Sequence, residues 1–313
     1  MTRTLLIMAT YNGCQYLKQQ LDSIRKQEYP VDRLIFRDDA STDETVSLLK
    51  TYISEYNLSH WEVRENEKNI GWRHNFHQLL IDAQDYCPEF IFFSDQDDIW
   101  DLDKNKKQLE IIENHPEIDL LTADMKVLKI NKKVSENHYH EFLDKENNLS
   151  KFPERLIYKS FRPGWTLVVR NQLVKDTLSF WPKEIEINHD ALLEDLSSLL
   201  GRGYNLNRSV GQHLRHGKNA SGKAIISLSS TRQEHIKALY DYQGFFEIIY
   251  QVLKKRHRVQ AQEVKEIADF YQRRYELAQV GEKNKILKGI IKDWSYYESF
   301  SGRIRDFLFT FKK

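Results

Sequence analysis

Residues 94–100 carry three aspartates, at positions 95, 97 and 98, directly after the apolar run of residues 90–93. Such a run predicts a buried strand, and carboxylates crowded at its end repel one another and are costly to remove from water. Aspartate oxygens are hard ligands that suit Mg²⁺ and Mn²⁺, often together with phosphate oxygens. The stretch therefore predicts a divalent-cation site. A polar loop whose aspartates cap the following helix is the alternative interpretation.

Three more polar clusters follow predicted strands in the first part of the chain, at residues 10–13, 38–43 and 69–73. Together with the aspartates they supply hydroxyl, amide, carboxylate and guanidinium groups. One polar loop is ordinary, but four at the ends of successive strands indicate a common binding crevice.

The elements that would position these clusters alternate in type. Short apolar runs predict strands, and apolar residues spaced at three and four predict helices between them. The predicted strands are 4–9, 34–36, 61–63 and 90–93, and the predicted helices are 16–27, 46–53 and 74–83. This alternation predicts a mostly parallel α/β sheet flanked by helices, with ligands beyond the carboxyl ends of the strands.

The middle of the chain continues with mixed elements. We expect a helix over residues 104–114, strands over 120–123 and 166–169, and a helix over 191–200. Residues 131–151 are polar and of mixed charge, which is typical of a surface excursion or a mobile loop.

From about residue 231 onward the sequence contains no strand-like run. The predicted helices there are 236–253, 259–277, 286–294 and 300–311. We therefore expect an α/β domain over residues 1–222 and an all-helical C-terminal region over residues 223–313. The last helix places Phe300, Ile304, Phe307, Leu308 and Phe311 on one face, with basic residues around it. Such a helix can lie on anionic lipid, or it can pack on other helices or on a second subunit.

The charge of the chain is close to balanced overall but uneven along it. The formal net charge is +1, which provides no argument for nucleic acid as a partner. Residues 231–313 contain 17 Lys and Arg against 11 Asp and Glu, so this region is basic. Cys14 and Cys87 supply no disulfide framework, and no run reaches the ~18 apolar residues of a membrane span. We expect a cytoplasmic protein, with peripheral contact to the inner face of the plasma membrane left open.

The ordered set of polar motifs resembles family 2 inverting glycosyltransferases with the GT-A fold, and more narrowly bacterial rhamnosyltransferases that build cell-surface polysaccharides. The resemblance covers roughly residues 3–222. The motifs that carry it are residues 8–13, 37–43, 69–71, 94–100, 189–190 and 216–219. A single Asp-x-Asp is a weak signal, whereas the whole set in this order is specific for the superfamily and only suggestive for rhamnose.

The resemblance implies a nucleotide-sugar donor, dTDP- or UDP-linked, that is bound at the rim of the sheet. Asp39 would bind the imide of the base, with Thr10 and Tyr11 lining its pocket, although both could equally be plain strand-end residues. Arg73 would clamp a phosphate, unless it is a solvated surface residue. The donor-binding residues implied in full are Thr10, Tyr11, Asn12, Asp39, Asn69, Gly71, Arg73, Asp95 and Gln96.

The resemblance also implies a bound cofactor, Mn²⁺ or Mg²⁺, that bridges the diphosphate of the donor. Asp97 would hold this metal, and Asp95 would contact the ribose. His216 would be a further metal ligand or a diphosphate contact, and a purely structural histidine is the alternative. Asp98 would be structural.

Inversion needs a base that deprotonates the acceptor hydroxyl as it attacks, and a carboxylate is the usual choice. Asp190, at the start of a predicted helix, stands where the family carries its base. The family usually follows this position with aromatic residues, whereas this chain has apolar aliphatic residues at 191–193. Glu194 and Asp195 therefore compete with Asp190, which could instead only cap the helix.

These residues predict a metal-dependent inverting glycosyltransferase that moves a sugar, with L-rhamnose from dTDP-rhamnose favoured, onto a cell-surface polysaccharide or a lipid-linked glycan. A UDP-hexose or UDP-N-acetylhexosamine transferase is the nearest alternative. A nucleotidyltransferase is disfavoured because the first strand leads into residues 9–13 and not into a Gly-rich basic loop. A non-catalytic nucleotide-sugar-binding module would tolerate loss of Asp97 and Asp190. The C-terminal helices would contact a membrane or a second copy.

Overall fold

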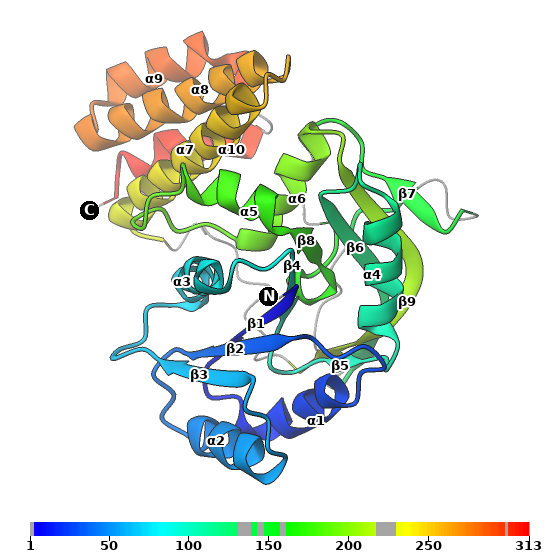
Figure 1. The fold of residues 1–313 in the computed structure, drawn as a ribbon. Helices are drawn as coiled ribbons and strands as arrows, with labels where there is room; N and C mark the ends of the chain where they lie inside the picture. Colours follow the sequence, from blue (N-terminus) through cyan, green and yellow to red (C-terminus); the bar gives the residue numbers. More distant parts are fainter. Residues whose placement is uncertain are drawn as a thin grey trace. The chain divides into compact units, whose positions relative to one another are not determined.

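The structure is a computed structural model, and it describes residues 3–130, 139–142, 147–156, 161–216, 230–297 and 300–312. The chain divides into two compact units (Figure 1). The first unit comprises Met1–Ser179 and Asn188–Ala220, and the second comprises Phe180–Ile187 and Ser221–Lys313.

A nine-stranded sheet forms the centre of the first unit, in the order β3-β2-β1-β4-β8-β6-β9-β5, with β7 paired to β9. Its strands are β1 Thr4–Thr10, β2 Arg33–Asp38, β3 Trp61–Glu65, β4 Phe90–Ser94, β5 Ile99–Trp100, β6 Leu120–Lys129, β7 Leu149–Lys151, β8 Val168–Arg170 and β9 Gly203–Arg215. Strands β1 to β4 pair in parallel, as do β6 and β9, whereas β5, β7 and β8 pair antiparallel. The expected mostly parallel α/β sheet is confirmed.

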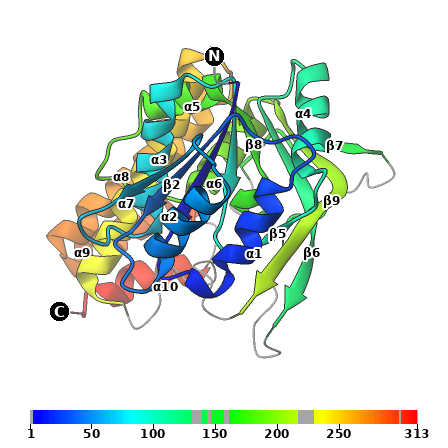
Figure 2. The same ribbon diagram turned by 60° about the horizontal axis from the view of Figure 1, so that its bottom comes forward.

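Strands β1 and β4 form because their residues are buried on both faces of the sheet, whereas β3 at the edge is only partly buried. In β1 and β4 nearly every side chain is inaccessible to solvent, which requires the continuous apolar runs seen in the sequence. The sequence did not predict β5, β7 or β9. Strand β9 runs beside β6 for most of its length (Figure 2), and its sequence is too polar to stand out as a strand.

Helices cover both faces of the strands β1 to β3. Apolar residues of α1 and α2 pack in one hydrophobic core with β1, β2 and β4, and α3 lies on the opposite face, against β1 and β2 (Figure 1). The helices of the first unit are α1 Cys14–Arg25, α2 Thr45–Glu55, α3 Trp72–Ala83, α4 Lys104–Asn114, α5 Asn171–Leu178 and α6 His189–Leu199, with short 3-10 turns at Gln84–Tyr86 and Gly164–Thr166. Each helix predicted in this unit is confirmed to within a few residues.

The polar segment of residues 131–151 is described only in part. Strand β7 lies at its end, so the segment is not a loop throughout. Residues 131–138 and 143–146 lie outside the described residues, so the expected mobile loop stays a prediction.

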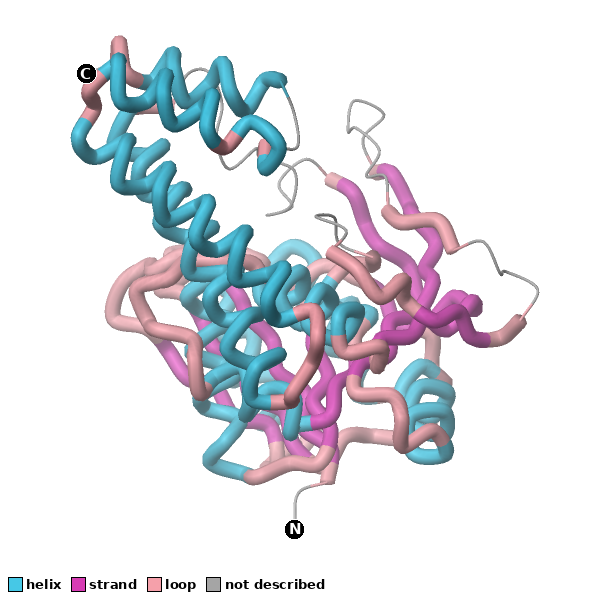
Figure 3. The backbone as a smooth tube through the Cα atoms, turned by 90° about the horizontal axis from the view of Figure 1, so that it is seen from above, coloured by secondary structure: helices cyan, strands magenta, loops and turns pink. Residues whose placement is uncertain are grey.

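The described part of the C-terminal region is helical (Figure 3). The helices are α7 Arg232–Lys255, α8 Ala261–Val280, α9 Lys283–Lys292 and α10 Phe300–Phe309, with a 3-10 turn at Trp294–Tyr296. A capping box between Thr231 and Glu234 begins α7. No helix in the described ranges combines the length and apolar character that crossing a bilayer requires.

A buried ion pair fixes α10 in the second unit. Arg274 donates two hydrogen bonds to Asp306, with distances of 2.7 and 2.8 Å, and the Tyr297 hydroxyl donates a third at 2.6 Å. Burial opposes ionisation of Asp306, but Arg274 holds the pKa of this carboxyl well below its ordinary value. The Asp306 side chain of α10 therefore faces the interior of its unit.

A lysine lies in the core beneath the aspartate stretch. Lys104, at the first position of α4, is fully buried, and its Nζ donates to Gln108 at 2.8 Å. The same nitrogen lies 3.9 Å from the centroid of the Trp100 ring. Burial lowers the pKa of Lys104 well below its ordinary value, because the charged form loses its hydration and no carboxylate of the described residues pairs with it.

This burial predicts a pH-dependent stability. The unfolded chain keeps the ordinary lysine pKa of about 10.4, so below that pH it binds more protons than the folded chain. The free energy of unfolding of the wild type should therefore rise with pH relative to that of Lys104→Met. The difference between the two should grow by up to ~1.4 kcal/mol per pH unit between about pH 7 and 10. Denaturant unfolding at several pH values measures it. Lys106→Met, at an exposed lysine, is the matched control, and the difference in free energy of unfolding between the wild type and this variant should not change with pH. A difference for Lys104→Met that does not change with pH contradicts the prediction.

Candidate active site

The carboxyl ends of the parallel strands bring the predicted polar clusters to one edge of the sheet. Thr10 lies opposite Asp38 in the β1–β2 register, and its hydroxyl donates to the Asp38 carboxylate at 2.9 Å. Thr10 is buried, so its side chain joins two strand ends. Asp39, directly after β2, lies against this junction because its amide donates to the Thr10 carbonyl at 2.9 Å.

The loop after β1 is tied to the aspartate stretch. Tyr11 and Gln96 exchange two hydrogen bonds, from the Tyr11 amide to Oε1 at 2.9 Å and from Gln96 Nε2 to the Tyr11 carbonyl at 3.0 Å. A Cβ at position 13 would lie 2.1 Å from Gln96 Oε1, so any larger residue in place of Gly13 would displace the Gln96 side chain. Asn12 adopts a positive φ of 46° and accepts from the Thr42 amide at 2.8 Å. The Tyr11 side chain is left 46% exposed at the rim.

Asp39 holds the loop at residues 69–71. Its Oδ1 accepts from the Ile70 amide at 2.8 Å, and its Oδ2 accepts from the Gly71 amide at 2.8 Å. Asn69 donates to the Asp39 carbonyl at 3.2 Å, and Gly71 has the positive φ of 83° that glycine adopts readily. A carboxylate has about four acceptor positions, so Asp39 keeps capacity for a further donor.

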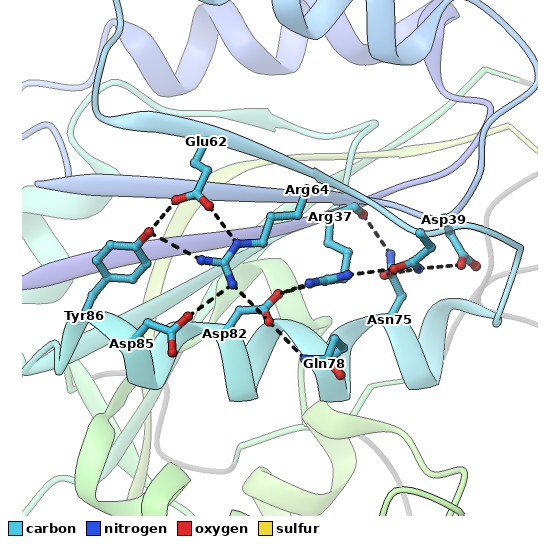
Figure 4. Close-up of polar contacts among 10 residues, drawn as sticks. Arg37, Asp39, Glu62, Arg64, Asn75, Gln78, Asp82, Asp85 and Tyr86 are labelled. Atoms are coloured by element: carbon cyan, nitrogen blue, oxygen red, sulfur yellow. Dashed lines mark hydrogen bonds and ion pairs between the residues drawn. The ribbon is translucent and has the colours of Figure 1, made fainter.

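A polar network extends from Asp39 along α3 (Figure 4). Asn66 donates to Asp39 Oδ1 at 2.9 Å and accepts from Arg37 at 2.7 Å. Arg37 in turn donates to Asp82 at 2.7 Å, and Asn75 donates to the Arg37 carbonyl at 2.8 Å. Besides the amides of the loop at residues 69–71, the Asp39 carboxylate is therefore oriented by a chain of side chains that reaches Asp82 near the end of α3.

Asp97 and His216 meet across the sheet edge. His216 Nε2 lies 2.7 Å from Asp97 Oδ2, and both side chains are largely buried. The His216 ring stacks on Tyr16 of α1, with ring centroids 4.5 Å apart. The two predicted metal ligands therefore face each other, whereas residues 217–219 of the same motif lie outside the described residues.

The other two aspartates have different surroundings. Asp98 is buried and pairs with His213 of β9, whose Nδ1 lies 2.7 Å from Oδ1. It does not cap α4, which begins after Asp103. Burial, followed by the charges of Asp98 and Asp97, raises the pKa of Asp95 well above its ordinary value, and Asp190 adds to this effect. No hydrogen bond from the described residues reaches the Asp95 carboxylate.

Asp190 lies in the first turn of α6, beside a set of packed rings. His189 stacks between Phe76 and Phe93, at centroid distances of 3.9 and 5.3 Å, and burial lowers its pKa to about 4. Arg73 donates to Asn188, the N-cap of α6, at 2.7 Å. This contact ties the start of α6 to α3 and leaves the Asp190 side chain partly exposed.

Glu194 and Asp195 are buried farther along α6. The two Glu194 oxygens accept from the amides of Phe161 and Arg162, at 2.9 and 3.0 Å. Burial and the charge of Asp190 raise the pKa of Glu194 well above its ordinary value. Glu194 therefore holds the segment before β8 and does not reach the rim.

Sequence reasoning missed Asn66 and Asn188, which contact the predicted site residues Asp39 and Arg73, and His213, which contacts Asp98. His213 lies in an unpredicted strand, where its neighbours Gln212 and Leu214 gave no signal of their own. Asn66 lies in the loop just after β3, so the rule that ligands gather at strand ends could have singled it out.

Comparison with known proteins identifies relatives of this chain. The chain is 27% identical to the poly(ribitol-phosphate) beta-N-acetylglucosaminyltransferase TarS of Staphylococcus aureus (strain MW2) over 253 residues, which are 80% of this chain and 39% of TarS. It is 38% identical to the dTDP-rhamnosyl transferase RfbG of Shigella flexneri over 108 residues, 34% of this chain and 36% of RfbG. The chain thus spans well under half the length of these relatives.

Solved structures share the fold. The crystal structure of S. aureus TarS 1-349 in complex with UDP-GlcNAc matches with a TM-score of 0.59 at 20% identity, over 97% of this chain and 91% of that one. GalNAc-T7 with UDP, GalNAc and Mn²⁺ matches with a TM-score of 0.57 at 12% identity, over 97% of this chain and 57% of that one. These likenesses confirm the GT-A fold.

The family model described as Glycosyl transferase family 2 matches residues 5–175, more than half of the chain. This range includes β1 to β4 and the three clusters at their carboxyl ends, together with the aspartate stretch. The chain therefore belongs to glycosyl transferase family 2.

Proposed function

We propose that this chain is a metal-dependent inverting glycosyltransferase that moves a sugar from a dTDP- or UDP-linked donor onto a glycan or a lipid-linked glycan. The observation that carries the proposal is the pair of Asp97 and His216, a carboxylate and an imidazole 2.7 Å apart just beyond the carboxyl end of β4. Burial, followed by the charges of Asp98, Asp97 and Asp190, raises the pKa of the neighbouring Asp95, which is consistent with a site that attracts positive charge.

The nucleotide would bind between the loop after β1 and the loop at residues 69–71. The exposed Tyr11 ring offers a surface against which a base can stack. The Asp39 carboxylate, with its remaining acceptor capacity, suits the imide N–H of uracil or thymine. Asn12, Asn69, Gly71 and Gln96 would shape this pocket through the loops that they hold, and Asp95 would contact the ribose.

The donor set of Asp97 and His216, a carboxylate and an imidazole, fits Mn²⁺ and less closely Mg²⁺. The described ranges contain no group of three His, Cys, Asp or Glu that could hold a metal ion. Diphosphate oxygens and water would therefore complete the coordination. The cation would supply positive charge to the departing nucleotide diphosphate, and Arg73 would add a hydrogen-bonding cation near the start of α6.

Asp190 would accept the proton of the acceptor hydroxyl. The acceptor oxygen forms a bond to the anomeric carbon as the bond from that carbon to the diphosphate breaks on the opposite side, which inverts the configuration. The partly exposed position of Asp190 suits contact with an acceptor. Glu194 is unsuited because both of its oxygens are occupied by backbone amides.

L-rhamnose from dTDP-rhamnose is our first choice of donor, and UDP-N-acetylglucosamine is the second. The RfbG match has the higher identity, whereas the TarS match covers more of this chain. The names of both relatives, a rhamnosyl and an N-acetylglucosaminyl transferase, support transfer of a sugar, and the TarS name gives a polymer, poly(ribitol-phosphate), as the acceptor.

A donor panel tests the activity. Purified protein should release nucleotide diphosphate from dTDP-rhamnose or from a UDP-sugar with Mn²⁺, at a rate at least ~100-fold above that with EDTA. Equal rates with Mn²⁺ and with EDTA would refute metal dependence. Release of pyrophosphate from a nucleoside triphosphate and a sugar phosphate would instead establish a nucleotidyltransferase. Binding of donor without any turnover, when acceptor glycans are supplied, would establish a binding module.

Substitution of the two carboxylates of α6 tests the base. Asp190→Asn should lower kcat by at least ~100-fold, because it removes the proton acceptor, while donor affinity and thermal stability stay near the wild-type values. Glu194→Gln should lower the free energy of unfolding by ~1–3 kcal/mol, since its NH₂ group would face a backbone N–H, and its folded fraction should stay active. Loss of activity in folded Glu194→Gln, together with near-normal kcat in Asp190→Asn, would assign the catalytic base to Glu194.

Substitution of Asn66 tests whether Asp39 recognises the nucleobase of the donor. Asn66→Ala removes a hydrogen bond that fixes Asp39 Oδ1, so the KM for the donor should rise ~10-fold while kcat stays within about twofold. Asn75→Ala is the control, because Asn75 is a buried member of the same network that contacts Asn66 and the Arg37 carbonyl but not Asp39. Equal KM values for both variants and the wild type would remove Asn66 from donor binding.

A further inference from the structure

Helix α10 exposes apolar residues and buries charge. Phe300, Ile304 and Leu308 are 63%, 42% and 41% exposed, whereas Asp306 is 8% exposed. The three apolar residues are spaced by four and therefore share one face, and Phe311 continues that face beyond the end of the helix. Phe300, Ile304, Leu308 and Phe311 are called the α10 stripe below. An amphipathic helix ordinarily buries such a stripe.

The contacts of Asp306 determine this orientation. Arg274 of α8 binds both oxygens of Asp306, and His235 of α7 lies 3.3 Å from it. Phe309 is also buried and stacks on His235 with centroids 4.3 Å apart. Turning the stripe inward would break these contacts and leave a buried arginine without its partner, which is costly. The outward stripe is therefore built into the second unit.

Basic side chains border the stripe at both ends. Lys283 Nζ lies 3.9 Å from the centroid of the Phe311 ring, and Arg303 Cζ lies 4.0 Å from that of Trp294. Trp294 is itself 49% exposed. Helix α9 contributes two more exposed apolar residues, Leu287 and Ile291. Aromatic rings beside cationic groups are the composition of protein surfaces that lie at the headgroup level of a bilayer.

The exposed charge around these residues is mostly positive. The exposed lysines of α9 are Lys283, Lys285, Lys288 and Lys292. Among the described residues of the range 283–312, the acidic ones are Asp293 and Asp306, and both are buried against arginines. At the margin, Glu282 binds Lys285, and Glu266 accepts from the Tyr296 hydroxyl.

We propose that the α10 stripe, with Trp294 and the lysines of α9, binds the surface of an anionic lipid bilayer. Apolar side chains would enter the boundary between headgroups and acyl chains, and the lysines would bind lipid phosphates. A second copy of the chain fits less well, because a twofold interface apposes each patch with itself and would bring the basic groups together. The proposal does not depend on the transferase activity or on its donor.

Vesicle flotation of the full chain tests the proposal. The protein should float with vesicles of phosphatidylcholine containing about 30% phosphatidylglycerol, and at least ~10-fold less with phosphatidylcholine alone. Salt should weaken the binding. Ile304→Ser combined with Leu308→Ser should lower partitioning at least ~10-fold, because both apolar side chains are lost. Lys288→Glu combined with Lys292→Glu should lower binding to the anionic vesicles to a similar extent.

Two control variants carry the same types of substitution at positions outside the proposed lipid-binding surface. Val259→Ser removes the 89% exposed valine before α8, and Lys106→Glu changes an exposed lysine of the first unit; both should float as the wild type does. Circular dichroism checks the helix content, and the lysine variant remains decisive if the serine variant unfolds. Absence of flotation, equal flotation with neutral vesicles, or unchanged flotation of both double variants overturns the proposal. A dimer in light scattering that the serine variant dissociates overturns it in favour of a second copy.

Discussion

Crowding of like charge at the carboxyl end of β4 is the constraint on which the site depends. Asp95, Asp97 and Asp98 cannot all remain ionised side by side without compensation. Asp98 is paired with His213 and Asp97 with His216, and both histidines come from β9 or the residue after it. Burial and the charge of Asp97 nevertheless raise the pKa of Asp98 well above its ordinary value, and burial, Asp98 and Asp97 do the same for Asp95. The negative charge at this edge of the sheet therefore favours binding of a cation, which Asp97 and His216 would hold.

Helix α3 connects the two ends of the proposed site. Asn75 and Asp82 lie in the network that orients Asp39 (Figure 4), while Phe76 packs on His189 and Arg73 binds Asn188. One rigid helix thus contacts both the carboxylate proposed for the base of the nucleotide and the helix that carries Asp190. Because a helix interior tolerates little deformation, the separation between these ends is fixed before any ligand binds.

The sequence predicted those parts that depend on local pattern. Strands β1 to β4 are continuous apolar runs, and the polar residues after them reach one edge because parallel strands share a direction. It could not predict that His213 would bind Asp98, since that contact joins residues 115 positions apart through the two-residue strand β5. Nor could it separate Asp190 from Glu194, because both stand on one helix and only the packing of Phe161 and Arg162 distinguishes them.

The periodicity of α10 likewise predicted an apolar face, but it did not predict whether that face would point inward or toward solvent. A buried ion pair contributes little net stability, since desolvation of both charges offsets most of their attraction. Breaking it by rotation of the helix would nevertheless be costly, so the pair of Arg274 and Asp306 selects one orientation from two. A core helix would have reached the same stability with apolar residues facing inward. Helix α10 instead buries a charge and exposes Phe300, Ile304 and Leu308. This arrangement has a physical rationale if the exposed face binds an apolar partner.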